Sequence, residues 1–383
     1  MSTLKAPEIN ISFKEKGASL IARGSRGIVL LAVKDTIVAP LKNPVTITST
    51  GDIPSTLDDT TKAQIKLALI GYQTAPIKVL VYGMGIAKEA ESDAIETAYT
   101  AAQKAWKDIK FDYLAIPTVS TDGKTQEIAT WVKSMRAAKK RIKAVLPNVE
   151  ADTEGVINYT INKNVYAETI TNEDGTISRV TTEYTAEQYC GRIAGLLCGT
   201  PLTISATYAP LGELDDCERV EENMDEAVGK GQFIVFYDGE KVKVSRAVNS
   251  FTTTVQGKGD AYKKCKIVDC MDLIADDLTK AIEDDYLGKY ANSYDNKCVL
   301  ISAIKMYLKQ LNIDGIVSDD FSVDFDIEAI KTYLVGKGKY TEEKLAAMDD
   351  TAIAKLDTGS RVMLKANVTI LDAMEDVDLP IAI

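Results

Sequence analysis

The stretch "GIVLLAV", Gly27–Val33, decides the fold class of the chain. It is the first of several short apolar runs typical of strands, and the segments between these runs have the apolar spacing of helices. Alternation of the two patterns along a chain indicates a three-layer α/β unit. The strand-like runs are Ile28–Val33, Ile77–Tyr82, Tyr113–Ile116 and Ile142–Leu146, and the helical patterns are Thr56–Leu69, Ser92–Ile109 and Thr125–Ala138.

The composition excludes several classes of partner. A formal net charge of −11 over 383 residues argues against nucleic acid and anionic membrane surfaces, because both attract basic patches. No apolar run reaches the roughly 18 residues of a membrane span, and the first ten residues lack the apolar core of a signal peptide. We therefore expect no membrane insertion and a protein that is made in the cytoplasm.

The chain contains no histidine, which removes the commonest general base and the commonest transition-metal ligand. Its six cysteines lack the paired spacing of a zinc site, so we interpret them as buried free thiols. The acidic clusters are Leu57–Asp59, Ile282–Tyr286 and Asp319–Glu328, and none of them matches a calcium loop. The sequence predicts no catalytic residue, no metal and no cofactor.

One turn leaves an enzymatic alternative open. Tyr82–Gly85 follows a strand-like run and contains Gly83-Met84-Gly85, so a phosphate-binding turn is conceivable. It lacks the complete glycine pattern of a dinucleotide site and the lysine-serine pair of a P-loop. An ordinary turn at the end of a strand is the stronger interpretation, and an α/β nucleotide-binding protein or enzyme remains the alternative.

The pattern changes after residue 157. Thr, Tyr and Val alternate across residues 158–187 around Asp174-Gly175, which favours a type I′ turn and predicts an exposed β-hairpin inserted into the α/β domain. Two long amphipathic helices and a strand follow, and they predict an α+β C-terminal domain. The domains expected are 1–26 as a strand arm with its connector, 27–240 as the α/β domain, 241–372 as the C-terminal assembly domain and 373–383 as a second strand arm.

Both ends of the chain alternate apolar and polar residues, which is the pattern of a strand with one apolar face. A strand at a chain end with no turn to pair it can add to the sheet edge of a neighbouring molecule. Burying four aliphatic side chains in this way contributes roughly 6–12 kcal/mol before the costs of ordering and association. The residues concerned are Ile9, Ile11 and Phe13 at the start of the chain and Val377, Leu379, Ile381 and Ile383 at its end.

Two further groups of residues have candidate roles in this pairing between neighbouring molecules. The connector 14–27 is rich in Lys, Arg, Gly and Ser, and Gly17, Gly24 and Gly27 are its candidate hinge positions. The stretch "SRVMLKANVTIL" is a predicted strand and a candidate receiving sheet, with Val362, Leu364, Val368 and Ile370 on one face.

The order of these segments resembles one protein family. The stretch "KKCKIVDCMDLIADDLTKAIEDDYLGKYANSYDNKCVLISAIKMYLKQL", Lys263–Leu311, resembles the C-terminal region of contractile tail sheath proteins, and "KVKVSRAVNSFTT", Lys241–Thr253, resembles the strand motif before it. "RGSRGIVLLAVKD" and "AGLLCGTPLTISATYAPLGEL" are similar to blocks in shorter sheaths of phages, defective prophages and tail-like bacteriocins of Gram-positive bacteria.

The resemblance implies a mechanical function. Sheath subunits form hexameric rings stacked into a helical tube around an inner tail tube, and their terminal arms add strands to the sheets of neighbours. The implied partners are other copies of the chain, the inner tail tube protein, and the baseplate and tail terminator proteins. Such a sheath assembles in the bacterial host cytoplasm, becomes part of a virion or a released tail-like particle, and contracts from a metastable extended state. A generic shell or adhesion protein would share the open strands but not the matching blocks.

Overall fold

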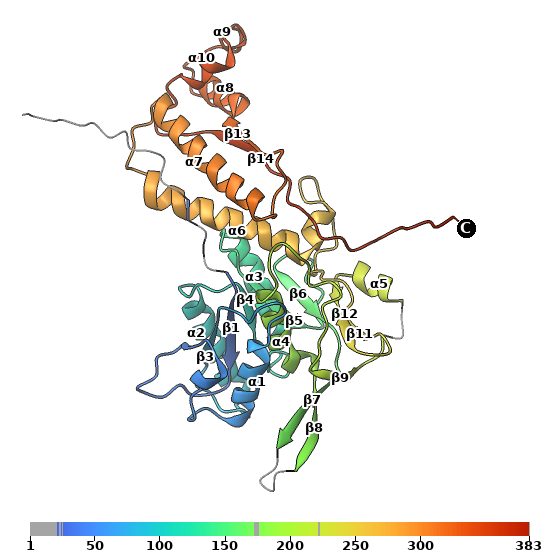
Figure 1. Cartoon of the computed structure of the whole chain (residues 1–383). Coiled ribbons are helices and arrows are strands. Elements are labelled where there is room, and N and C mark those ends of the chain that lie inside the picture. Colours follow the sequence, from blue (N-terminus) through green and yellow to red (C-terminus); the bar gives the residue numbers. More distant parts are fainter. Residues whose placement is uncertain (1–20, 23, 25, 172–175, 221–222, 383) are drawn as a thin grey trace, which may run out of the picture. The chain divides into compact units, whose positions relative to one another are not determined.

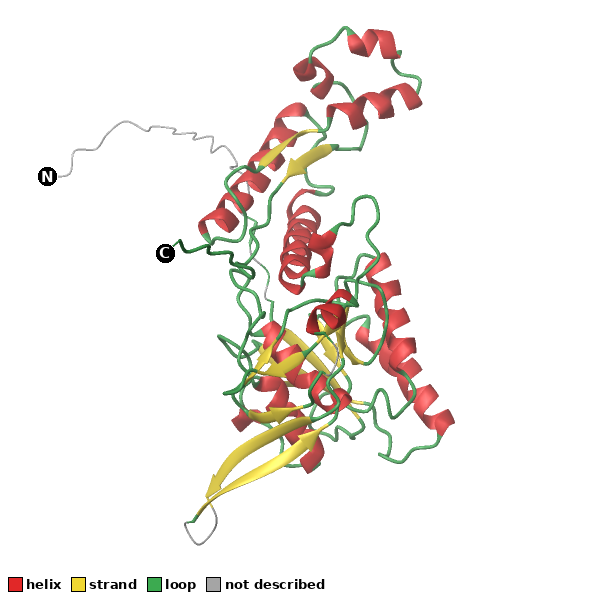
Figure 2. Cartoon of the chain, turned by 90° about the vertical axis from the view of Figure 1, so that its right-hand side faces the viewer, coloured by secondary structure: helices red, strands yellow, loops and turns green. Residues whose placement is uncertain are grey.

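The computed structural model describes residues 21–22, 24, 26–171, 176–220 and 223–382, which form a mixed α+β fold in two compact units (Figure 1). The α/β unit comprises residues 24–276 and 370–382. The small unit comprises residues 277–369 with the described residues before Gly24. Figure 2 separates helices from strands in a second view.

A seven-stranded sheet forms the centre of the α/β unit, in the order β10-β6-β5-β4-β1-β3-β2. All neighbouring strands are parallel except that β2 is antiparallel to β3. The strands are β1 (Ile28–Val33), β2 (Val45–Ile47), β3 (Lys78–Gly83), β4 (Tyr113–Ala115), β5 (Lys143–Pro147), β6 (Val156–Tyr159) and β10 (Gln232–Phe233).

Strand β1 confirms the three-layer prediction, because its six residues are all buried and alternate between two cores. Val29, Leu31 and Val33 pack in one core with helices α1 (Asp59–Leu69) and α4 (Ala186–Cys198). Ile28, Leu30 and Ala32 pack in the other with α2 (Ser92–Trp106) and α3 (Thr125–Ala137). Burial of each large aliphatic side chain contributes about 1.5–3 kcal/mol, so this strand stabilises both layers at once.

Local sequence explains why α4 packs so closely on α1. Thr185 and Gln188 form a capping box that starts α4, and the Asp58 carboxylate caps α1 at the backbone N–H of Thr61. Gly195 faces α1, where an added Cβ would lie 2.2 Å from the carbonyl oxygen of Ala68. A larger residue would therefore force the two helices apart.

The predicted hairpin is present as β7 (Asn164–Thr171) and β8 (Ile177–Tyr184), which pair antiparallel over their full length. Residues 172–175, and with them the predicted Asp174-Gly175 turn, lie outside the described residues. Strand β9 (Leu214–Cys217) pairs with the other edge of β7. The remaining elements of the α/β unit before α6 are η1 (Thr50–Asp52), α5 (Met224–Gly229), β11 (Val235–Tyr237), β12 (Val242–Val244) and η2 (Asp260–Lys263).

Helix α6 (Cys265–Ala281) begins in the α/β unit, and its residues from Asp277 onward belong to the small unit. A π-helical turn (Ile282–Tyr286) follows, and in the small unit the Tyr307 hydroxyl donates to Asp277 at 2.8 Å. The other elements of this unit are α7 (Tyr294–Ile313), β13 (Ser322–Phe325), α8 (Ile327–Gly336), α9 (Glu342–Ala346), α10 (Asp350–Ala354) and β14 (Leu364–Asn367). One cluster of its buried apolar side chains is formed by Ile330, Leu334, Leu345 and Ile353.

The boundary expected between residues 240 and 241 falls between β11 and β12, inside the α/β unit. The compact units divide instead within α6 and again between Thr369 and Ile370. The assignment of residues 241–372 to assembly stays a prediction.

A buried ionic cluster fixes the first half of α6 to the sheet. Lys143 of β5 bridges Asp269 at 3.1 Å and Asp272 at 2.9 Å, and all three residues are buried. Arg136 of α3 binds the Asp272 carboxylate through two nitrogens, at 2.9 and 3.0 Å, and the Tyr113 hydroxyl donates to Asp269. Burial alone would raise the pKa of Asp272, but the charges of Lys143 and Arg136 outweigh burial and hold the pKa below its usual range.

The cysteines are free thiols, as the sequence predicts. Five of the six are buried, and the sixth, Cys298, is half-buried. Burial raises the pKa of Cys190, Cys198 and Cys265 well above the ordinary thiol value and that of Cys217 to about 11.

Candidate assembly surface

The C-terminal segment is fixed to the α/β unit by three carboxylates, and we call Asp372–Asp376 the anchor. Lys264 pairs with Asp372 at 2.5 Å and with Glu375 at 3.2 Å, and Arg246 pairs with Asp376 at 2.5 Å. Burial would raise the pKa of Asp372, but the hydrogen bonds from Lys264 and the N–H of Ala373, together with the charges of Lys264 and Lys266, outweigh this effect and lower the pKa. These contacts determine the point from which the last residues leave the unit.

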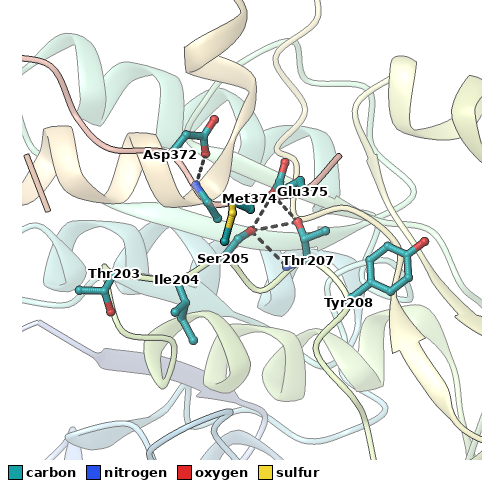
Figure 3. Close-up of a pocket in the computed structure, with 9 residues that line it drawn as sticks. Thr203, Ile204, Ser205, Thr207, Tyr208, Asp372, Met374 and Glu375 are labelled. Carbon is teal, nitrogen blue, oxygen red and sulfur yellow. Dashed lines mark hydrogen bonds between the residues drawn. The ribbon is translucent and has the colours of Figure 1, made fainter. Parts of the chain in front are cut away.

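Glu375 is the innermost residue of the anchor, with 5% of its side chain exposed. Figure 3 shows its carboxylate pointing at two hydroxyl groups of the loop after α4. The hydroxyl of Ser205 donates to Glu375 at 2.9 Å and that of Thr207 at 2.6 Å. A pocket of about 570 Å³ lies between this loop and the anchor (Figure 3). Its lining residues are Thr203, Ile204, Ser205, Thr207, Tyr208 and Asp372–Glu375.

The residues after the anchor form what we call the C-terminal arm, Val377–Ala382. Its three large aliphatic side chains are mostly exposed: Val377 by 80%, Leu379 by 74% and Ile381 by 76%. The arm has no regular secondary structure in this single chain, and Ile383 lies outside the described residues. Exposed aliphatic side chains grouped in this way are typical of an interaction site. The prediction that the arm becomes a strand stays a prediction.

The candidate receiving residues occupy different positions in the structure. Leu364 begins β14, whereas Val362 precedes that strand and Val368 follows it. Ile370 lies in the α/β unit, where the chain leaves the small unit. The predicted strand is therefore shorter than its apolar alternation suggests. Among the described residues β14 pairs only with β13, so one edge of β14 is open.

The N-terminal candidates lie mostly outside the described residues, since Ile9, Ile11, Phe13 and Gly17 precede Ile21. Gly27 is held in place in the structure. Its N–H donates to Asp112 at 2.7 Å, its carbonyl accepts from Ile77 at 2.8 Å, and its φ is +102°. Any hinge in the connector therefore lies before Gly27, and the hinge roles of Gly17 and Gly24 stay predictions.

The Tyr82–Gly85 turn offers no set of free N–H groups to a phosphate. The N–H of Gly83 donates to the Asn43 side chain at 3.1 Å, that of Met84 to Val33 at 2.9 Å and that of Gly85 to Asp35 at 3.0 Å. Phosphate-binding loops need several backbone N–H groups that point at the ligand. The geometry thus argues against the nucleotide-binding alternative.

The described residues contain neither a candidate metal site nor a membrane-spanning helix. Within those residues, no group of three or more acidic or cysteine side chains is arranged to hold a metal ion. The helices in the same part of the chain are too short or too polar to cross a membrane.

Sequence reasoning missed the anchor. Its partners Arg246, Lys264 and Ser205 lie 108 to 170 residues away from the acids that they bind, so no local pattern connects them. The available signal was weak, namely a run of acids just before the aliphatic arm and the basic "KKCK" at the start of α6. Opposite charges of this kind occur throughout the chain, so their pairing is visible only in the fold.

Comparisons with known proteins identify the family. Residues 257–383 match the family described as phage tail sheath C-terminal domain. The tail sheath protein of Clostridium phage phiCD119 is 34% identical over 378 residues, which is 97% of this chain and 97% of that protein. The phage-like element PBSX protein XkdK of Bacillus subtilis is 27% identical over 62% of this chain and 48% of its own length. The chain belongs to the tail sheath protein family.

Solved structures have the same fold. A sheath tail protein from Desulfitobacterium hafniense superposes with a TM-score of 0.65 at 21% identity, over 83% of this chain and 94% of that one. The sheath tail protein Lin1278 from Listeria innocua gives 0.62 at 18% identity, over 80% and 90%. A chain of the anti-feeding prophage baseplate gives 0.62 at 13% identity, over 99% of both chains.

Proposed function

We propose that this protein is the subunit of a contractile sheath, which polymerises as stacked hexameric rings around an inner tail tube and shortens to drive that tube through a cell envelope. Baseplate and tail terminator proteins are its other expected partners. Membership of the tail sheath family supports this function. The observation that carries the proposal is the exposed C-terminal arm beside an anchor whose Glu375 side chain is buried.

The anchor and the arm have properties that suit a link between subunits. The anchor is held by ion pairs on its own subunit, whereas the arm exposes Val377, Leu379 and Ile381 to solvent. An open strand edge on a neighbouring subunit would pair the backbone of the arm and cover these side chains. The open edge of β14, which begins at Leu364, is the candidate receiver.

We propose that contraction needs no catalysis. The stored energy is the difference in free energy between two packings of the same folded subunits, a transition between two stable arrangements of rigid bodies. The hydrogen-bonded N–H groups of Gly83, Met84 and Gly85 support this view. The nucleotide-binding alternative predicts saturable ligand binding by monomers, whereas a sheath predicts tubes that form without ligand as the protein concentration rises.

Electron microscopy of the purified protein tests the function. We expect the wild-type chain to form tubes above a threshold concentration, and a chain lacking Val377–Ile383 to remain a folded subunit that forms none. Val377, Leu379 and Ile381 contribute little to the subunit because they are exposed, so the melting temperature should change by less than about 2 °C. A large drop in melting temperature would mean that the arm belongs to the core of its own subunit.

A further inference from the structure

Positive charge is concentrated in two short segments of a chain whose net charge is −11. The segment 133–141, "KSMRAAKKR", has five basic residues and no acid, and the segment 104–110, "KAWKDIK", has three lysines and one acid. The first extends from the last turns of α3 into the loop before β5, and the second extends from the last turn of α2 into the loop before β4. Both segments therefore occupy equivalent places in the α/β unit.

The fold brings the two segments together. Helices α2 and α3 run in the same direction, because α2 joins β3 to β4, α3 joins β4 to β5, and these strands are parallel. The Gln103 amide of α2 donates to Glu127 of α3 at 2.5 Å. After the helices, the Lys140 amine donates to the carbonyl of Lys107. The C-terminal ends of α2 and α3 thus form one continuous surface.

We call the exposed lysines of this surface the basic end of the α2–α3 layer. They are Lys104, Lys107, Lys110, Lys133, Lys139 and Lys140. None of them forms an ion pair within the part of the chain that the structure describes. Elsewhere, Lys62 of α1 and Lys331 of α8 pair with acids on their own helices, at 3.0 and 2.8 Å. The basic end therefore keeps its charge available to another molecule.

The helix dipole explains only part of the basic end. A cation near the C-terminus of a helix contributes about 0.3–1 kcal/mol, and the effect falls off outside the last turn. Lys104 lies in the last turn of α2, and Lys107 is its C-cap residue. Lys110, Lys139 and Lys140 lie beyond the ends of their helices. The dipole gives no reason for these last three lysines.

The opposite end of α2 carries unpaired negative charge, and we call it the acidic end. Glu89, Glu91 and Asp93 are exposed there, and their side chains form no ion pair with any described residue. Glu91 is the N-cap residue of α2, yet its side chain makes no cap hydrogen bond. A helix of 15 residues is about 22 Å long, whereas charges are screened over about 8 Å at physiological salt. The two ends therefore cannot neutralise each other within one chain.

A second copy of the chain supplies the complement of both ends. Contact between the basic end of one copy and the acidic end of another uses two different surfaces, so each pair still presents one free end of each sign. Such a head-to-tail contact can repeat along a filament. Nucleic acid or an anionic membrane would also attract the lysines, but the net charge of −11 on the chain opposes both.

We propose that the basic end of the α2–α3 layer docks on the acidic end of a second copy and forms a head-to-tail contact between subunits. This inference rests on the proposed function, which supplies the further copies. Complementary charges of this kind orient the partners and speed their encounter, and like charges brought together oppose it. The contact involves only the α/β units and is separate from the C-terminal arm.

Charge reversal at each end tests the contact. The basic-end variant is Lys107→Glu with Lys110→Glu, and the acidic-end variant is Glu89→Lys with Glu91→Lys. Each variant alone would bring like charges together, so we expect the threshold concentration for tube formation to rise about tenfold. The control, Lys42→Glu with Lys66→Glu, reverses two exposed lysines elsewhere in the α/β unit and should stay within about twofold of wild type.

A chain that carries both reversals separates docking from local helix stability. Its two ends are again complementary, so its threshold should return to within about threefold of wild type. An equimolar mixture of the two single-end variants should also form tubes, because each supplies the charge that the other lacks. If the charges acted only on their own helix, the doubly reversed chain would have the lowest melting temperature and the highest threshold, and the proposal would be overturned.

The remaining outcomes are also distinguishable. Loss of tubes in the basic-end variant with none in the acidic-end variant would mean that a different acidic surface receives the basic end, and would overturn docking on α2. Normal tubes from both variants would overturn the contact altogether while leaving the proposed function intact. Absence of tubes in wild type would overturn the proposed function itself.

Discussion

Lys143 and Asp272 illustrate how a few charged side chains fix the position of a whole helix. The Lys143 amine lies in the interior between the carboxylates of Asp269 and Asp272 on α6. Arg136 is a second cation that binds the Asp272 carboxylate. Buried ion pairs add little to stability relative to apolar replacements, but loss of one partner leaves an uncompensated charge inside the protein. Removing the charge of either Lys143 or Asp272 alone should therefore destabilise the folded chain.

We expect Asp272→Asn to reduce the free energy of unfolding at pH 7 by about 3–5 kcal/mol, because Lys143 and Arg136 then lose a buried counter-charge. The pKa of Asp272 is lowered in the folded chain, so its contribution is present above the unfolded-state value near 3.9 and is lost as the pH falls through the folded-state value. Urea unfolding at several pH values measures the effect.

The difference between wild type and Asp272→Asn should therefore shrink below about pH 4. Lys133→Gln, an exposed change on the same helix as Arg136, is the matched control and should stay within about 0.5 kcal/mol of wild type. A constant difference across the whole pH range would show that the Asp272 carboxylate is not the cause.

At the scale of elements, the hairpin β7–β8 divides into a buried base and an exposed outer part. Asn164 is fully buried at the base, and its amide donates to the carbonyls of Ile161 at 2.9 Å and Tyr184 at 3.1 Å. Beyond Ala167, the described residues of β7 are exposed. The base thus belongs to the core, and the outer part does not.

We expect replacement of residues 169–179 by a short Asn-Gly turn to change the melting temperature by less than about 2 °C, because the described residues of that range bury little surface. Asn164→Ala should cost about 1–3 kcal/mol, because it removes the side-chain amide that donates to the buried carbonyl of Ile161 and to the partly buried carbonyl of Tyr184. Calorimetry of the two variants compares them directly. A large loss from the hairpin deletion with none from Asn164→Ala would reverse this assignment.

Periodicity reveals the elements whose interactions are local and misses those that depend on distant partners. The apolar run of β1 and the alternation of the hairpin are visible in the sequence because burial selects residue types at neighbouring positions. Strand β14 is shorter than its pattern because alternation does not indicate where the partner strand ends. The buried role of Lys143 depends on acids about 130 residues away, which no local pattern can identify.

At the scale of the whole molecule, the connector before Gly27 and the C-terminal arm are the expected links between subunits. The bonds of Gly27 fix the connector at the start of β1, and the anchor fixes the arm at the opposite end of the chain. A link held at both ends transmits displacement only if its length is limited. The length of the connector should therefore control how the motion of one subunit reaches the next.

We expect three flexible residues inserted after Gly17 to add up to roughly 10 Å of slack and to leave assembly intact, because lengthening a loop costs only a fraction of a kcal/mol. Shortening after a contraction trigger should fail, so that the tubes remain extended. Tube length in electron micrographs provides the measurement. Equal shortening in the insertion variant and in wild type would mean that contacts between the folded bodies drive contraction and that the arms only tether subunits.

The burial of five of the six thiols has a consequence for a subunit that leaves a reducing compartment. The thiolate is the form that oxidants attack, and the raised pKa of Cys190, Cys198, Cys217 and Cys265 keeps these thiols protonated near neutral pH. Cys298, which is half-buried, is the one left within reach of peroxide or of a second thiol. The mechanical properties of the subunit should therefore be largely insensitive to the redox potential of its surroundings, and any oxidative ageing should begin at Cys298.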